Sequence, residues 1–103
     1  MDLVQDIYKV TAVFPKSEVY ALTSQMRRAA VSVPSNIAEG AARNGSKEFF
    51  HFLSIARGSL SELETQIQIA QRLGYMRENN LLEKVDTVFG LIGGLMKPVK
   101  NRC

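Results

Sequence analysis

The fold is decided by the stretch FFHFLSIARGSLSELETQIQIA, residues 49–70. Its apolar positions alternate in steps of four and three: Phe49, Leu53, Ala56, Leu60, Leu63, Ile67 and Ala70. Residues at these spacings share one face of an α-helix, and three successive heptads are typical of helices that pack side by side at about 20°. The stretch therefore predicts a long amphipathic helix inside a helical bundle.

Two predicted helices precede this stretch, a short first helix and a longer second helix. Leu3, Ile7, Val10 and Phe14 first outline a short helix that ends before Pro15, so the next helix should start near Lys16 or Ser17. The apolar stripe of that second helix is continuous: Val19, Leu22, Met26, Ala29, Val33 and Ile37. The stripe runs through Pro34, which predicts a continuous helix kinked near Ala30, with Ser32, Ser35 and Asn36 placed to satisfy backbone groups freed by the proline.

The helix ends have their own signals. We expect Asn44 and Gly45 to end the second helix, Ser46 to cap the third, and Gly74 to end the third. A fourth helix repeats the alternation at Leu81, Val85, Val88, Ile92 and Leu95 and should close at Pro98. Short connections make consecutive helices antiparallel neighbours, so residues 1–103 predict one all-α domain, an up-down-up-down antiparallel four-helix bundle.

Composition limits the class of protein. The chain has 103 residues, 46% of them apolar, which suits a single ordered domain. No apolar run approaches the roughly 20 residues that span a bilayer, and the N-terminal segment lacks the pattern of a signal peptide, so we expect a cytoplasmic protein without a membrane partner. The one cysteine, Cys103, is the last residue and is expected to be an incidental free thiol.

Apolar residues also occur away from the core stripe. Tyr20, Val31 and Ala38 do so on the second helix, and Ile55, Ile69 and Leu73 on the third. A second apolar face predicts a second buried contact, most simply self-association. The alternative is a monomer with scattered surface aliphatics.

A polar flank borders the core on each of these helices. On the second helix it comprises Gln25, Arg28, Ser32, Asn36, Glu39 and Arg43, and on the third Arg57, Ser61, Glu64 and Gln68. If the flanks face each other, arginines meet carboxylates and the smaller groups satisfy one another. We therefore predict a half-buried polar network that fixes the register of the bundle, with Arg28 and Arg57 in structural roles.

These residues carry a family resemblance. The pattern Gln-x-x-Arg-Ala-Ala, Ser-x-x-x-Asn-Ile-Ala-Glu-Gly and Gly-Ser-x-x-Glu-Leu-Glu is matched at Gln25, Arg28 to Ala30, Ser32, Asn36 to Gly40, Gly58, Ser59 and Glu62 to Glu64. Residues 8–75 thereby resemble the bacterial four-helix-bundle family named for reading frames inside intervening sequences of 23S rRNA genes. The family usually opens with Leu-x-Val-Trp-x-x-Ala before the tyrosine matched by Tyr8, whereas this chain has no tryptophan; either its start is truncated or its first helix is shorter.

The resemblance implies a small bundle that commonly forms a homopentamer without established catalysis. A related protein, the accessory protein of diversity-generating retroelements, is similar in fold and is a basic pentameric partner of a reverse transcriptase and its RNA. Self-association is thus the expected partnership, with RNA, DNA or a reverse transcriptase as further candidates.

The sequence gives little support to catalysis. Glu62 and Glu64 are two residues apart on a helix and point about 200° from each other, so they cannot act as a carboxylate pair. His51 is the only histidine and has no second ligand at helical spacing. No glycine-rich phosphate loop or nucleophile motif occurs. We expect a protein that is not an enzyme and has neither metal nor cofactor.

The sequence favours nucleic-acid binding instead. Net charge is +3, and five copies in a ring multiply each basic cluster fivefold. The candidate contacts are Lys16, Arg27, Arg43 and Lys47. The alternative is a protein-interaction scaffold that does not bind nucleic acid directly.

Overall fold

The computed structural model describes the backbone of residues 2–77 and 79–102 and the side chains of this range up to Pro98. Its elements are α1 (Asp2–Thr11), the short 3-10 helix η1 (Lys16–Glu18), α2 (Leu22–Ala42), α3 (Ser46–Arg72) and α4 (Leu81–Arg102). All regular secondary structure in the described residues is helical, which confirms the predicted four-helix bundle. The expectation about Cys103 lies outside the described residues.

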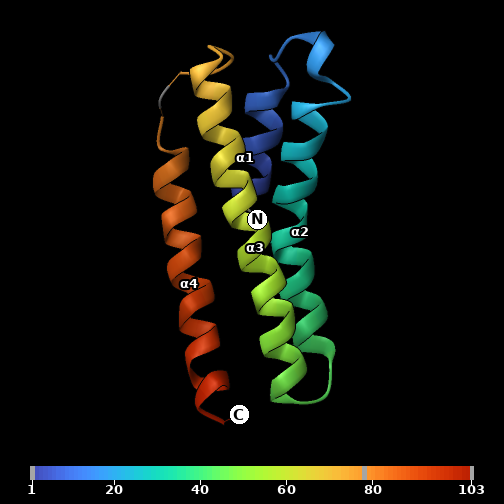
Figure 1. Ribbon diagram of the computed structural model, residues 1–103, viewed down its shortest axis with the longest axis vertical. Helices are drawn as coiled ribbons and strands as arrows, with labels where there is room; N and C mark the ends of the chain where they lie inside the picture. The colour runs from blue at the N-terminus through green and yellow to red at the C-terminus, as the bar shows by residue number, and fades with distance from the viewer. Residues whose placement is uncertain (1, 78, 103) are drawn as a thin grey trace.

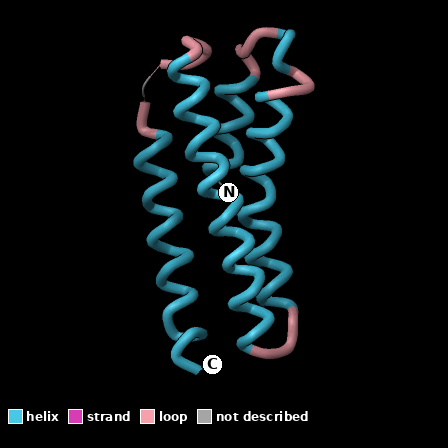
Figure 2. The backbone as a smooth tube through the Cα atoms, in the orientation of Figure 1, coloured by secondary structure: helices cyan, strands magenta, loops and turns pink. Residues whose placement is uncertain are grey.

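The helices alternate in direction, up and down, along the long axis of the molecule (Figure 1). α3 packs between α2 and α4, and α1 contacts both α2 and α4 from the other side. α1 has only 10 residues where α2 has 21, so it covers just the upper part of the bundle (Figure 2). The lower part is a three-helix layer.

The core follows the predicted stripes closely. The largest fully buried side chains are Ile7, Met26, Leu53, Leu60, Leu63, Ile67, Leu81, Val85 and Ile92. Every member of the α3 stripe after Phe49 is buried, and Phe49 packs half-buried against the same cluster. The heptad prediction for residues 49–70 is confirmed.

The predicted start of the second helix is wrong. Residues after Pro15 form the η1 turn, whose hydrogen bond from the Glu18 amide to the Pro15 carbonyl spans 2.9 Å. Ala21 then leaves helical geometry, with φ −120° and ψ −105°, before α2 begins at Leu22. Val19, assigned to the core stripe, is consequently 45% exposed, because the break turns it away from the core.

Glycines shape the two turns at the ends of α3. α2 ends at Ala42, where Arg43 becomes extended, and so before the predicted end at Asn44 and Gly45. Gly45, at φ 107°, instead occupies the N-cap of α3. Ser46 is therefore the first residue of α3 and not its cap, because the glycine reaches a conformation that serine does not favour. Gly74, at φ 78°, ends α3 as predicted, with the Tyr75 amide donating to the Ala70 carbonyl at 3.0 Å.

Two prolines lie inside helices. α2 continues through Pro34 without a break, as predicted, while its kink stays a prediction. α4 does not close at Pro98 but extends to Arg102. A proline removes only one helical donor, and here the freed carbonyl belongs to Gly94, an exposed residue whose carbonyl water can satisfy. Leu95, expected in the core, is 41% exposed, and Met96 is buried in its place.

Candidate functional site

The polar residues between α2 and α3 form a compact seam. The hydroxyls of Ser32 and Ser59 share a hydrogen bond of 2.8 Å. The Asn36 amide donates to the Ser32 carbonyl at 2.8 Å and to the Ser32 hydroxyl at 2.9 Å. This part of the predicted network exists, and it links α2 and α3 at one position along their length. Asn36 donates to the carbonyl of Ser32 and not to the carbonyl of Ala30, which Pro34 leaves without its helical donor.

Among the described side chains, no other predicted member of the network forms a hydrogen bond or ion pair between α2 and α3. α3 presents Ser59 to α2, so Ser61, two residues further on, points about 200° away. The α3 flank of Arg57, Ser61 and Glu64 thus lies on the other side of its helix. Arg28 and Gln25 are exposed, and among the described residues the one arginine–carboxylate pair near the seam is Arg43–Glu39, at 3.5 Å within α2.

Gly40 brings α2 and α3 into close approach. A Cβ placed on Gly40 would lie 2.7 Å from the Cβ of Phe52 and 3.1 Å from Cδ1 of Phe49. Real side chains do not tolerate the first distance, so only glycine fits unless the helices move apart. The matched sequence signature around Ser32, Asn36 and Gly40 therefore serves packing.

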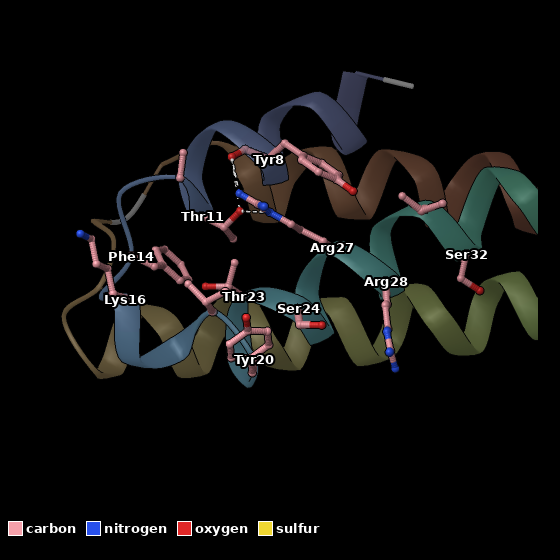
Figure 3. A pocket seen from close by; sticks show the side chains of 13 residues that line it. Tyr8, Thr11, Phe14, Lys16, Tyr20, Thr23, Ser24, Arg27, Arg28 and Ser32 are labelled. Atoms are coloured by element: carbon pink, nitrogen blue, oxygen red, sulfur yellow. Dashed lines mark hydrogen bonds between the residues drawn. The ribbon is translucent and has the colours of Figure 1, made fainter.

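An open cleft of about 680 Å³ lies on another side of α2, where α1 and η1 meet it (Figure 3). Its lining is rich in hydroxyl, aromatic and basic side chains: Tyr8, Thr11, Ala12, Phe14, Lys16, Val19, Tyr20, Thr23, Ser24, Arg27, Arg28, Val31 and Ser32. Of the described residues that line it, none is Asp or Glu. The cleft is thus basic, with three cationic side chains at its surface.

Arg27 joins α1 to α2 at the wall of this cleft (Figure 3). Its Nε donates to the Thr11 hydroxyl at 2.9 Å, and its Nη2 donates to the Tyr8 carbonyl at 3.5 Å. Its guanidinium carbon lies 4.6 Å from the centroid of the Tyr8 ring, a cation–π contact. Arg27 is therefore held in place, and it brings a fixed positive charge to the cleft in addition to its structural role.

Glu18 is the acidic residue nearest in sequence to the residues that line the cleft, and its carboxylate is engaged outside the cleft. Glu18 accepts a hydrogen bond from the Tyr75 hydroxyl at 2.7 Å and one from the Leu22 amide at 3.4 Å. The hydrogen bond to this carboxylate raises the pKa of Tyr75 above its usual 10.0, with burial and the negative charge adding to the shift. Glu18 therefore forms an ion pair with neither Lys16 nor Arg28, which both line the cleft.

The structure brings two predicted surfaces together. Lys16 and Arg27, predicted to contact nucleic acid, line the same cleft as Tyr20 and Val31, predicted to lie at an oligomer interface. Tyr20 is 97% exposed. The remaining predicted interface residues, Ala38, Ile55, Ile69 and Leu73, are exposed outside this cleft.

The other two predicted contacts are remote from it. Arg43 and Lys47 lie around the turn between α2 and α3, at the opposite end of a molecule 46 Å long (Figure 1). The Arg43 guanidinium pairs with Glu39 and lies 5.3 Å from the Phe52 ring centroid. The four predicted basic residues therefore form two separate sites.

Sequence reasoning missed several lining residues. Tyr8 and Thr11 are three apart on α1 and so share a face, a spacing that gave a signal for a polar contact. Thr23 is only 5% exposed, and its hydroxyl lacks a hydrogen-bond partner among the described residues. Arg28 was assigned to the seam, whereas it lines the cleft.

A second, apolar groove of about 580 Å³ lies below the start of α1. It exists because α1 is too short to cover the lower part of α2 and α4. Its lining consists of Leu3, Val4, Ala30, Val33, Pro34, Ile37, Val88, Gly90, Leu91, Ile92, Gly94 and Leu95. Leu91 is 63% exposed there, an unusual position for a leucine of a small bundle.

No group of three or more His, Cys, Asp or Glu side chains in residues 2–77 and 79–102 is arranged to hold a metal ion. None of the helices described here combines the length and the apolar character needed to cross a bilayer.

Fold and site together define a class: a small all-helical bundle with a basic cleft at one end and an apolar groove beside it. The sequence model of the 23S rRNA-intervening sequence protein family matches residues 1–94, and the chain belongs to that family. Among curated proteins, none matches this chain.

Proposed function

We propose that this protein is a non-catalytic homo-oligomer, most simply a pentamer, that binds the backbone of RNA or DNA through its basic cleft, repeated around the assembly. One observation carries the proposal: the cleft gathers Lys16, Arg27 and Arg28 without a carboxylate among its described lining residues. A concave surface of one charge sign concentrates the field of its side chains and attracts polyanions.

The pairing of nearby acids supports this reading. Glu18 is engaged by Tyr75, and Asp6 forms an ion pair with Lys84 on α4. Both acidic side chains thus neutralise or satisfy groups away from the cleft. A family named after a sequence inside an rRNA gene is consistent with an RNA ligand, although the name describes a gene position and not a binding activity.

The oligomer is supported by apolar surface on more than one side of the molecule. Leu91 and Leu95 border the groove, whereas Ile69 on α3 and Leu73 just after it are exposed elsewhere. Two different apolar surfaces on one chain favour head-to-tail contacts, which close into rings when the rotation permits. The number five comes from the family resemblance. Light scattering at micromolar concentration tests it, and a monomer would contradict it.

The second candidate function is a protein-interaction scaffold, supported by the apolar groove. None of its described lining residues is charged, so the groove suits an apolar helix better than a phosphate backbone. A partner such as a reverse transcriptase belongs to this alternative.

Fluorescence anisotropy with a labelled RNA of about 20 nucleotides tests the proposal. The double variant Lys16→Glu/Arg28→Glu should weaken binding and reduce the slope of log K against log salt, by about 0.7 for each lost phosphate contact with a single strand. Arg27 is left intact because it holds α1.

Two further double variants with the same charge change locate the surface. Arg57→Glu/Lys97→Glu, outside the cleft, should lower affinity less and leave the slope nearly unchanged. Arg43→Glu/Lys47→Glu tests the opposite end of the molecule. A larger loss from this last pair would show that the cleft is the wrong surface, and no salt-sensitive binding of the wild-type protein would reject the function.

A further inference from the structure

We infer that the cleft takes single-stranded nucleic acid and stacks a base on the ring of Tyr20. The inference rests on the proposed function and specifies its ligand: an unpaired segment, with phosphates at the basic side chains and one base on the tyrosine. It follows from the position of the aromatic rings, from the hydroxyl groups between them and from the shape of the cleft.

Tyr20 is the free aromatic ring of the cleft. It lies between η1 and α2, and the residue is 97% exposed, so little of the protein covers either face of the ring. Tyr8, across the cleft, differs because Arg27 already lies over its ring. In Figure 3, Tyr20 extends from the segment between η1 and α2, whereas Arg27 extends from α2 to α1, with Tyr8 beyond the arginine. A base entering the cleft therefore finds one open stacking surface, in a cleft whose lining also includes the fixed positive charge of Arg27.

The hydroxyl groups add polar capacity. Thr23 and Ser24 follow Tyr20 on α2 and line the same cleft. The Ser24 residue is half-buried and part of it can be reached from the cleft, whereas the Thr23 hydroxyl has no exposed surface for a ligand to contact. Phosphate and sugar oxygens are suitable partners for the Ser24 hydroxyl, since they accept hydrogen bonds from serine.

The concave shape favours a single strand over a duplex. Bases in a duplex are stacked on one another and show only their edges, so none can lie on Tyr20 without being unpaired. A duplex also meets a protein along an extended row of phosphates, whereas the cations here surround a cleft of about 680 Å³. An unpaired segment can bend into such a cleft with its bases available for stacking.

The test compares three labelled probes on the intact oligomer: a single-stranded RNA, the same RNA annealed to its complement, and an abasic strand of equal length. Tyr20→Ala should weaken binding of the single strand by about 5- to 150-fold per site, the usual range for removing a stacking ring. The salt slope should stay unchanged because the cations remain. Tyr20→Phe is the matched control, and it should bind like the wild type. The duplex and the abasic strand should bind more weakly and should not respond to Tyr20→Ala.

Failure of this inference is distinguishable from failure of the proposed function. Equal binding of all three probes, unaffected by Tyr20→Ala but weakened by Lys16→Glu/Arg28→Glu, would overturn stacking and leave backbone binding in place. A change of oligomer size caused by Tyr20→Ala in light scattering would assign Tyr20 to the self-interface and overturn the inference as well. Absence of salt-sensitive binding to every probe would reject the proposed function itself.

Discussion

The side of α2 that packs on α3 and the side that borders α1 are built differently. Against α3, the contact uses small residues and neutral hydrogen bonds, with Ser32 bonded to Ser59 and Gly40 in contact with Phe52. Against α1, which also buries Leu3 and Ile7 in the core, the long side chain of Arg27 crosses between the helices and leaves an open basic cleft beside it. Substitutions on the side of α2 that packs on α3 should lower the stability of the protein. Substitutions on the side that borders α1 should weaken nucleic-acid binding.

The largest stability effect should come from Gly40→Ala. The new methyl group would meet the Cβ of Phe52 at 2.7 Å, so α2 and α3 must separate. We expect a loss of about 1–3 kcal/mol in the free energy of unfolding, measured by urea denaturation. Gly58→Ala is the matched control, because its Cβ meets nothing within 4 Å. It should stabilise by about 0.5–1 kcal/mol through helix propensity, and equal effects of the two variants would contradict the close approach.

A smaller loss should follow from Arg27→Met, which removes the bonds to Thr11 and Tyr8 but keeps much of the side-chain length. We expect about 1 kcal/mol, since the guanidinium is half-exposed and its contacts are screened by water. Arg28→Met, at an exposed neighbour, should stay within about 0.5 kcal/mol. If both variants unfold like the wild type, Arg27 does not hold α1.

The seam hydrogen bond should contribute less still. A double-mutant cycle of Ser32→Ala and Ser59→Ala isolates it, with an expected coupling of about 0.5–1 kcal/mol because the hydroxyls are half-buried. The coupling is read from urea midpoints of the four proteins. A value near zero would mean that the two hydroxyls act independently.

The smallest effect concerns alkaline pH. The pKa of Tyr75 is raised in the folded state, so its hydrogen bond to Glu18 contributes fully below the unfolded pKa near 10.0 and is lost as pH rises through the folded value. The wild-type protein should lose more stability above pH 10 than Tyr75→Phe does. Identical pH profiles for the two proteins would show that this hydrogen bond does not couple to folding.

The sequence predicted the helices better than their contacts. The heptads of α3 are local and strong, so its face, its end at Gly74 and its buried residues followed directly. A helical wheel shows that two polar flanks exist, but the arrangement of the whole bundle decides which flank meets which neighbour. That is why Ser59, not Ser61, bonds to Ser32.

The candidate site was only partly predictable for the same reason. Lys16, Arg27 and Tyr20 were identified from charge and wheel position, whereas Tyr8 and Thr11 reach Arg27 across 19 and 16 residues of chain. The break at Ala21, which places Tyr20 beside the cleft, follows from backbone geometry that no side-chain pattern indicates. Arg43 and Lys47 carry the same charge as Lys16 and Arg27, but the fold places them at the opposite end of the bundle.

The most direct test of the account is to locate bound RNA on the protein. Zero-length ultraviolet crosslinking of a single-stranded RNA to the assembled protein, followed by mass spectrometric mapping, identifies the residue in contact. The account predicts crosslinks on the peptide that contains Tyr20. Crosslinks confined to the turn that contains Arg43 and Lys47, or to no peptide at all, would contradict it.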